Sequence, residues 1–241
     1  SYFIGGGLGL ILMISRIKVF ESGIFMKLKE QHVKRGNIIK LFNNKTRLIK
    51  YLSSILIGTP IWFVTGILIT FSPEFAQAMG LSNPVDAGLA VMFTFSGQVV
   101  GNLASGFLSQ YLQSRKKVIL LFIFLSFLFV AVYLLVPVHN TTLFYLLCSC
   151  LGFCSGYWTL FITVAAEMFG SDLRATVATT VPNFVRGAVI PLTMFFVMAK
   201  VNMGIMYGAL AVGTVTYAIA VIALLYLDET FKKDINYIEG E

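Results

Sequence analysis

Residues 118–136 read VILLFIFLSFLFVAVYLLV, a run in which only Ser126 and Tyr133 carry a polar side-chain atom. Coiled as an α-helix, a run of this length extends about 28 Å, close to the roughly 30 Å hydrocarbon core of a bilayer. A helix that is apolar on all sides either lies in a large protein core or spans a membrane. The run therefore predicts a transmembrane helix.

Five other blocks of the chain have a similar length and apolar character. They are Leu52–Phe71, Ala87–Leu108, Leu143–Ala166, Pro182–Ala199 and Tyr207–Leu227. Of the 241 residues, 57% are hydrophobic and only 12% are charged. A soluble domain has about 25% charged residues to wet its surface. We therefore predict an all-α membrane protein, with a bundle of six transmembrane helices over residues 51–228.

The segments outside this bundle differ in composition. The apolar block Tyr2–Ser15 is too short to cross a bilayer comfortably, so residues 1–15 are interpreted as the truncated end of another helix. Residues 16–50 form a basic connector in which apolar residues alternate with lysines. This pattern favours one or two amphipathic helices on the membrane surface, and a flexible basic linker is the alternative. Residues 229–241 form a C-terminal tail.

Lysine and arginine residues gather in alternate loops between the predicted spans. Ten lie in residues 16–50, three in 115–117, one at Arg174 and two at Lys232 and Lys233. The intervening loops 72–86 and 137–141 contain none, and the link near Asn202 contains only Lys200. The positive-inside rule then predicts a multi-pass cell-membrane protein with the connector and the C-terminus in the cytoplasm. This distribution explains the net charge of +7 with the lipid bilayer as a partner and without nucleic acid.

The sequence contains no arrangement typical of an enzyme or of a metal site. Cys148, Cys150 and Cys154 lie in one apolar helix, where they cannot all face one metal ion, and we interpret them as packing residues. No predicted span contains paired carboxylates, a histidine or a Ser/His pair. We therefore expect no catalytic residues, no metal and no cofactor.

Two spans carry stripes of small and polar residues at helical spacing. The second has Thr94, Gln98, Asn102, Ser105 and Ser109, and the fourth has Ser149, Gly152, Gly156, Thr159, Thr163 and Glu167. Such stripes indicate either close helix packing or the wall of a water-lined cavity. Because an amide is costly to bury in a membrane, Gln98 and Asn102 favour a cavity in the second span. For the fourth span both interpretations stay open.

The fifth span contains Arg186, with Asn183 one turn earlier on the same face. An arginine at mid-membrane costs at least about 2.5–3.5 kcal/mol on insertion scales, so it needs a functional partner or a structural one such as helix carbonyls. Trp62 and Trp158 are candidates for the walls of the same site, and simple packing is the alternative. The residues expected to bind a solute are Arg186, Asn183, Gln98, Asn102, Trp62 and Trp158.

Four short motifs occur in order along the chain. They are Arg16–Ser22, Gly106–Lys117, Ala166–Arg174 and Asp228–Thr230. The first resembles the Pro-Glu-Ser motif of the sugar-porter-like branch of the major facilitator superfamily, and the second resembles the family's cytoplasmic loop signature. The third resembles the Glu…Arg loop before helix eleven, and the last the closing Pro-Glu-Thr. Together they resemble the C-terminal half of such a transporter.

This resemblance implies that the bundle contains helices seven to twelve and that residues 1–15 end helix six. The partner would be an N-terminal six-helix half, and helices seven, eight, ten and eleven would line the solute path. The resemblance also implies a cytoplasmic gate in which Glu167 pairs with Arg174, with Arg115 and Glu229 beside them.

We therefore expect one half of a secondary active transporter, which moves a small polar solute by alternating access and is not an enzyme. The sugar-porter resemblance implies a sugar and symport, whereas an intramembrane arginine favours anionic or polar solutes. No aspartate or glutamate lies in the middle of a predicted span, so a group for proton coupling would come from the other half. A membrane sensor or interaction protein on the same fold, inactive in transport, is the alternative.

Overall fold

The computed structural model describes residues 2–16, 38–81 and 83–232, which form helices joined by turns and contain no strand. The chain divides into two units, residues 1–35 and 36–241. The first contains helix α1 (Tyr2–Arg16), so the predicted short helix is present there. The predicted amphipathic helices of the connector fall largely on residues 17–37, outside the described residues, as does the tail beyond residue 232.

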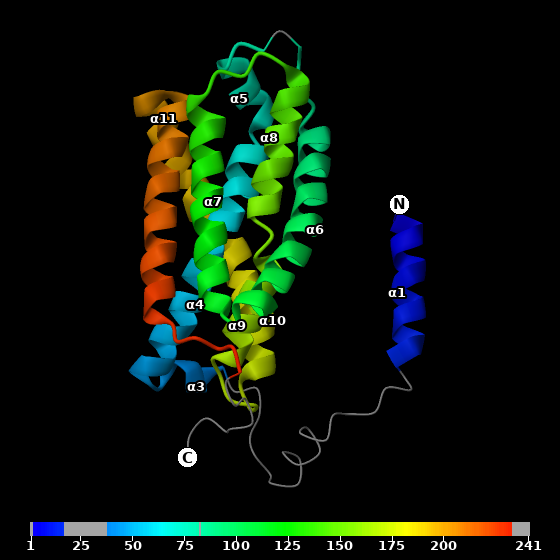
Figure 1. Ribbon diagram of the computed structural model, residues 1–241, viewed down its shortest axis with the longest axis vertical. Coiled ribbons are helices and arrows are strands. Elements are labelled where there is room, and N and C mark those ends of the chain that lie inside the picture. Colours follow the sequence, from blue (N-terminus) through cyan, green and yellow to red (C-terminus); the bar gives the residue numbers. More distant parts are fainter. Residues whose placement is uncertain (1, 17–37, 82, 233–241) are drawn as a thin grey trace. The chain divides into compact units, whose positions relative to one another are not determined.

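The second unit is a bundle of helices (Figure 1). Its elements are α3 (Ile39–Phe42), α4 (Lys45–Phe63), the π-helix η1 (Val64–Ile69), α5 (Ser72–Ala78), α6 (Ala87–Leu112), α7 (Arg115–Leu135), α8 (Thr141–Cys154), α9 (Trp158–Glu167), α10 (Arg174–Gly187) and α11 (Val189–Tyr226). Side-chain oxygens cap several helix starts, because the first amide groups of a helix have no partner within it. Asn44 caps α4, Asp86 caps α6, Ser114 caps α7 and Asn140 caps α8.

Five helical stretches of the described residues are long and apolar enough to cross a membrane. The last, Arg174–Tyr226, has 53 residues and contains Gly204 with φ 77° and ψ 167°, a conformation that side chains other than glycine rarely adopt. Four residues later, a methyl group on Gly208 would lie 2.8 Å from the backbone nitrogen of Lys200, so the two arms of α11 run close together. The chain therefore reverses at Gly204, and the six predicted spans are present.

Three of the spans depart from a continuous α-helix. Pro60 lies inside α4, which passes into the π-helix η1. α8 and α9 are separated by turns at Ser155–Tyr157, and α10 gives way to α11 at Ala188. Pro191 cannot donate a hydrogen bond to the carbonyl of Gly187, which explains the last break. Interruptions of this kind are tolerated in membranes where neighbouring groups satisfy the backbone.

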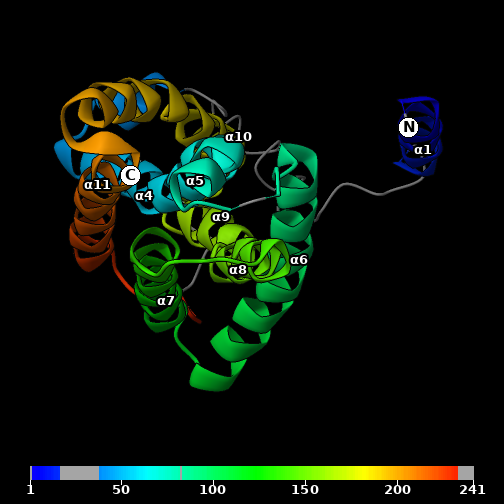
Figure 2. The same cartoon turned by 90° about the horizontal axis from the view of Figure 1, so that it is seen from above.

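The closest helix pair is α6 with α8, and the arms of α11 pack against α4 and α7 (Figure 2). The outer faces are apolar: on α6, for example, Val99, Leu103 and Phe107 are more than half exposed. A water-soluble protein rarely leaves so many large side chains uncovered, whereas lipid solvates them. The all-α membrane fold predicted from the sequence is confirmed.

Three ion pairs and one contact between a carboxylate and backbone amide groups join elements at one end of the bundle, which we call the basic end. They are Lys40–Asp172 at 3.1 Å, Lys50–Asp228 at 3.6 Å, Arg115–Glu167 at 2.7 Å and the contact of Glu229 with the start of α7. At the opposite end, Lys200 on α11 pairs with Glu74 on α5. Figure 1 shows α3 and the start of α7 at the lower end and α5 at the upper end. Successive spans therefore run in opposite directions in the bundle, and the side of the membrane that each end faces stays a prediction.

Candidate functional site

Arg186, Trp62 and Trp158 come together from three different helices. The guanidinium carbon of Arg186 lies 5.9 Å from the ring centroid of Trp62 and 6.0 Å from that of Trp158. The two indole rings are 6.2 Å apart at an interplanar angle of 73°, an edge-to-face pair. A cation within about 6 Å of an aromatic face is attracted by the negative face of the ring. The structure thus forms one cluster from three of the predicted solute-binding residues, and we call it the Arg186 cluster.

The position of Arg186 follows from close packing of α4 against α10. Gly58 on α4 lies so near α10 that a methyl group there would be 2.9 Å from Cγ1 of Val185, the residue before Arg186. A hydrogen bond of 2.8 Å from the hydroxyl of Tyr51 to Oγ1 of Thr180 joins the same two helices. Arg186 itself lies in the last turn of α10, where the helix dipole favours a cation.

The depth of Arg186 in the bundle follows from its place in the helix. Twelve residues separate it from Arg174, the first residue of α10 at the basic end. This separation corresponds to about 18 Å of helix, which is more than half of a hydrocarbon core of about 30 Å. The side chain is nevertheless exposed on the surface of the bundle. Arg186 therefore presents its charge about 18 Å along the bundle from the basic end.

Asn102 holds the broken helix that presents Trp158. Its Oδ1 accepts hydrogen bonds from the backbone nitrogen of Thr159 at 3.2 Å and from Oγ1 of Thr159 at 3.1 Å. Beside it, the hydroxyl of Tyr157 donates to the carbonyl of Ile57 on α4 at 3.1 Å. Asn102 therefore satisfies an amide at the open start of α9 and fixes the first turn of that helix.

Trp62 brings an unsatisfied donor to the Arg186 cluster. Its Nε1 is buried and has no hydrogen-bond partner among the described residues. An indole nitrogen can only donate, and buried donors in proteins nearly always have an acceptor. Trp62 lies two residues after Pro60, where α4 approaches its π-helical end. The cluster therefore contains a cation and a buried N–H group, both of which suit an acceptor.

The remaining predicted solute-binding residues have different surroundings. Asn183 is exposed one turn before Arg186, and its Nδ2 donates to the carbonyl of Thr179 in its own helix at 2.8 Å. Gln98 is buried, with 8% of its surface exposed, on the side of α6 that carries the packing glycines.

The stripe of the second span packs in a seam against Ser149, Gly152 and Gly156 of the fourth span, whereas Thr159 and Thr163 of the fourth span are exposed. Methyl groups on Gly97 and Gly101 would lie 2.0 and 2.1 Å from carbonyl oxygens of α8, and one on Gly152 would lie 1.9 Å from the carbonyl oxygen of Thr94. The other stripe residues of α6, Thr94, Ser105 and Ser109, are at most 2% exposed. The predicted cavity along α6 is therefore wrong for these positions, because glycine lets the backbones meet and leaves no room for water.

The ion pair at the basic end also differs from the predicted one. Glu167, the last residue of α9, pairs through Oε2 with Nη1 of Arg115 at 2.7 Å, and both side chains are less than one-fifth exposed. The family resemblance implied Arg174, seven residues later in the sequence, as its partner. Arg174 begins α10 after the turn at residues 168–173, whereas the bundle brings the first residue of α7 to the end of α9. The predicted Glu167–Arg174 latch is thus replaced by Glu167–Arg115 in this conformation.

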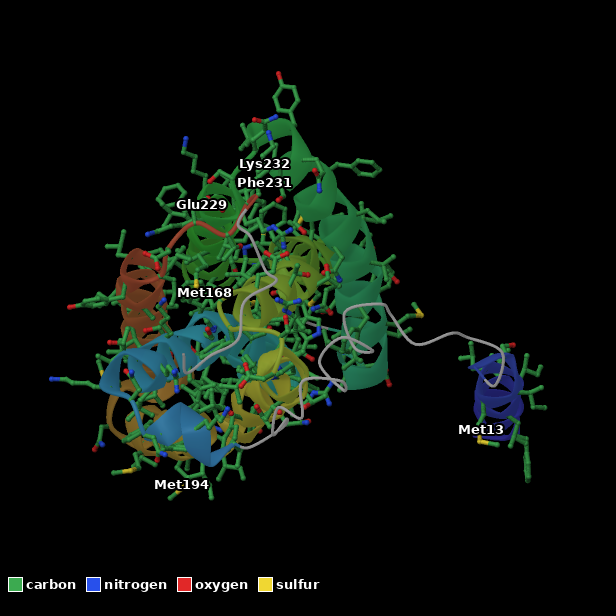
Figure 3. All side chains as sticks on the ribbon, turned by 90° about the horizontal axis from the view of Figure 1, so that it is seen from below. Met13, Met168, Met194, Glu229, Phe231 and Lys232 are labelled. Atoms are coloured by element: carbon green, nitrogen blue, oxygen red, sulfur yellow. The ribbon has the colours of Figure 1, made fainter. Side chains whose placement is uncertain are left out.

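Glu229 closes the start of α7. Its carboxylate accepts hydrogen bonds from the hydroxyl of Ser114 and from the backbone nitrogens of Arg115 and Lys116, the last two at 3.0 and 3.3 Å. In return, Nζ of Lys116 donates to the carbonyls of Leu225 and Leu227 at 3.0 and 2.7 Å. Figure 3 views the bundle from this end and labels Glu229 beside the start of α7. Sequence reasoning missed Ser114, whose place before a basic helix is typical of an N-cap.

These hydrogen bonds outweigh the effect of burial on the Glu229 carboxyl group. Burial raises its pKa, but hydrogen bonds from Ser114 and from the backbone of Phe231, Arg115 and Lys116 lower it below the ordinary value of 4.5. The negative charge is therefore stabilised at the helix start, where the helix dipole is positive.

Comparison with known proteins identifies the family of the chain. No curated protein sequence matches the chain, but the family description of the Major Facilitator Superfamily matches residues 1–192, most of its length. The match covers α1, the first four spans and the helix that carries Arg186. Members of this family are membrane transporters and not enzymes. With its multi-pass helical bundle and this match, the chain belongs to the Major Facilitator Superfamily.

Proposed function

We propose that the chain is the C-terminal half of a secondary transporter that binds a small anionic solute at the Arg186 cluster. The observation that carries this proposal is the charge of Arg186. Among the residues that the structure describes, no carboxylate lies within ion-pair distance of it. A cation at this depth is costly unless something compensates its charge.

The carboxylates of the described residues are all engaged elsewhere. Glu74 pairs with Lys200, Asp172 with Lys40, Asp228 with Lys50 and Glu167 with Arg115, while Asp86 and Glu229 accept hydrogen bonds from the starts of α6 and α7. Two aromatic faces attract a guanidinium, but they carry no net charge. An anionic solute would supply the missing charge, which supports an acid over a neutral polar molecule.

The geometry of the cluster suits a planar acid group. A guanidinium offers parallel N–H groups that match the two oxygens of a carboxylate or a phosphate. The buried Nε1–H group of Trp62 supplies a further donor. The indole rings of Trp62 and Trp158 form apolar walls, and Asn183 lies one helical turn away. We infer a small solute with one acid group and a flat or apolar body.

Alternating access would expose this site to each side of the membrane in turn. We infer that an N-terminal six-helix half completes the wall around Arg186, as in transporters that rock two bundles around a central site. The Arg115–Glu167 pair would hold the basic end in one of the two states. By the positive-inside rule this end faces the cytoplasm, and we infer that the membrane is the cell membrane. Coupling to protons would need a titratable group outside the described spans.

A sugar is the second candidate, because the motif resemblance points to sugar porters and an indole face also packs against a sugar ring. Arg186 can donate hydrogen bonds to hydroxyl groups, but a neutral sugar would leave its charge uncompensated. A sensor on the same fold would bind the solute without moving it. The three functions differ in what binds and in whether it crosses the membrane.

The test uses the full-length protein, purified and reconstituted in liposomes. Binding and uptake of a panel of monocarboxylates, phosphorylated metabolites and neutral hexoses would be compared. Arg186→Lys should preserve the melting temperature and weaken acid binding about 10–100-fold, because an ammonium cannot form the paired hydrogen bonds. Arg47→Lys at the basic end is the control for the same chemical change. Tight binding of hexoses only, or native acid affinity in Arg186→Lys, would overturn the proposal.

A further inference from the structure

A long apolar groove runs between α7 and the second arm of α11, the arm after Gly204. It encloses about 810 Å³ and is lined mainly by leucine, isoleucine, valine and phenylalanine, including Leu121, Phe124 and Phe127 on α7 and Val221 and Ile222 on α11. Figure 2 shows that α7 and α11 are neighbours. α10, which carries Arg186, contributes no residue to the groove. The groove is therefore separate from the proposed solute site.

The few polar groups along the groove are already satisfied within the protein. The hydroxyl of Tyr217 shares a 2.5 Å hydrogen bond with the hydroxyl of Ser126. Oγ1 of Thr214 donates to the carbonyl of Leu210 at 2.8 Å. A polar ligand would find no free partner in this part of the groove. Its surface suits a hydrocarbon chain.

A second cavity, which we call the polar cavity because polar and charged residues make up most of its lining, adjoins the groove at the basic end. It encloses about 530 Å³ and is lined by Gln113, Ser114, Lys116 and Glu229 together with Lys117 and Leu120, which also line the groove. The two cavities thus form one continuous surface with an apolar part and a polar part. Such a surface matches a molecule with a hydrocarbon chain and a polar head.

The length of the apolar part matches one leaflet of a bilayer. On α7 the groove extends from Lys117 to Phe127, ten residues apart. Ten residues of helix rise about 15 Å, which is half of a hydrocarbon core of about 30 Å. A single acyl chain of the leaflet at the basic end would therefore fill the groove, and its head would lie at the level of Lys117.

The charge of the polar cavity is positive. Lys117 is exposed, and no carboxylate of the described residues lies within ion-pair distance of it. Nζ of Lys232 lies 3.5 Å from Oε1 of Gln113, which places a further cation beside this cavity. Lys116 also lines it, and the one acidic residue there, Glu229, directs its carboxylate to the amide groups at the start of α7. The cavity therefore has three lysines in or beside it and one carboxylate, which already accepts hydrogen bonds from the start of α7.

We propose that this surface binds an anionic glycerophospholipid of the surrounding bilayer. One acyl chain lies in the groove between α7 and α11, and the phosphate binds Lys117, with Lys116 and Lys232 adding to the positive potential. The charge complementarity and the one-leaflet length favour a lipid over an apolar helix of a second protein. A lipid here would bridge the third and sixth spans along their shared face.

The test is native mass spectrometry of the full-length protein in detergent with added phosphatidylglycerol or with phosphatidylcholine of the same acyl chains. Phosphatidylglycerol should bind at least about fivefold more tightly, the effect of one lysine near an anionic headgroup. Lys117→Gln should remove most of that preference. Lys45→Gln, which removes an exposed lysine from the start of α4 at the same end, should leave it intact.

A second pair of variants tests the groove itself. Ala218, an exposed residue that lines the groove, would fill it when replaced by tryptophan, and Ala218→Trp should weaken phosphatidylglycerol binding about tenfold or more. Val215→Trp, on an exposed position of α11 that does not line the groove, should have no effect. Equal binding of the two lipids would overturn the proposal. So would equal effects of the two lysine variants or of the two tryptophan variants, or a co-purifying protein in place of lipid.

Discussion

Gly152→Ala tests the packing seam between α6 and α8. The added methyl group would lie 1.9 Å from the carbonyl oxygen of Thr94, whereas an ordinary contact begins at 3.4 Å. The two backbones must therefore separate by about 1.5 Å, since neither partner is a flexible side chain. Overpacking of this kind costs about 1–3 kcal/mol. The hydrogen bond of 2.7 Å from Ser105 to the carbonyl of Gly156 lies in the same seam, and its loss adds about 1 kcal/mol.

The expected destabilisation is therefore about 2–4 kcal/mol, which corresponds to a fall in melting temperature on the order of 10 °C. Thermal unfolding of the full-length protein in detergent, followed by size-exclusion chromatography, measures it. Gly106→Ala is the matched control, because no atom lies within 4 Å of the added methyl group on the same helix α6. Alanine also favours a helix over glycine by about 1 kcal/mol. Equal melting temperatures for the two variants would show that α6 and α8 are not in backbone contact.

Three further expectations concern the site and the basic end. Charge reversal at Arg115 or at Glu167 should lower the melting temperature, and the double reversal should restore part of it; purely additive effects would contradict the 2.7 Å pair. Glu229→Gln should lower stability at neutral pH. Because the folded pKa is lowered below 4.5, this loss should vanish as the pH falls through the folded pKa, and a pH-independent difference in melting temperature would refute the charged contact. Asn102→Ala should weaken solute binding several-fold, because Thr159 loses its hydrogen-bond acceptor at the start of α9. Tryptophan fluorescence measures the affinity, and an unchanged affinity would show that this contact does not support solute binding.

The six spans and their directions could be predicted because both depend on local properties of the chain. Span length follows from the thickness of the bilayer, and alternation follows from the positions of lysine and arginine. The interruptions were harder to foresee. A proline such as Pro60 signals a weakened helix, but whether the chain kinks, breaks or forms a π-helix depends on the neighbours that satisfy the freed carbonyls.

The Arg186 cluster was predicted in part. Trp62, Trp158 and Arg186 were candidates because each is large or costly in a membrane, and the fold brings them within about 6 Å of one another. The stripe on α6 was misread as a cavity wall because small polar residues serve both purposes. Only the distance between backbones distinguishes the two, and that distance depends on α8.

The partner of Glu167 could not be read from the sequence for a similar reason. Arg174 is near in the chain, whereas Arg115 is near only after α7 and α9 have packed together at the basic end. Ion pairs between helices depend on the tertiary arrangement. The expected role of Arg174 in the gate stays a prediction.

The contact between Glu229 and the start of α7 has a consequence for the timing of synthesis. Glu229 follows Ser114 by 115 residues, so at about 5–20 residues per second the ribosome adds it roughly 6–23 s later. During that interval the third span already exists, while the first amide groups of α7 still lack the carboxylate that accepts from them. A nascent chain that stalls before residue 229 therefore keeps the Ser114 cap but leaves the amide groups of Arg115 and Lys116 without their carboxylate acceptor. Residues that follow the sixth span thus complete the start of a helix that was made 115 residues earlier.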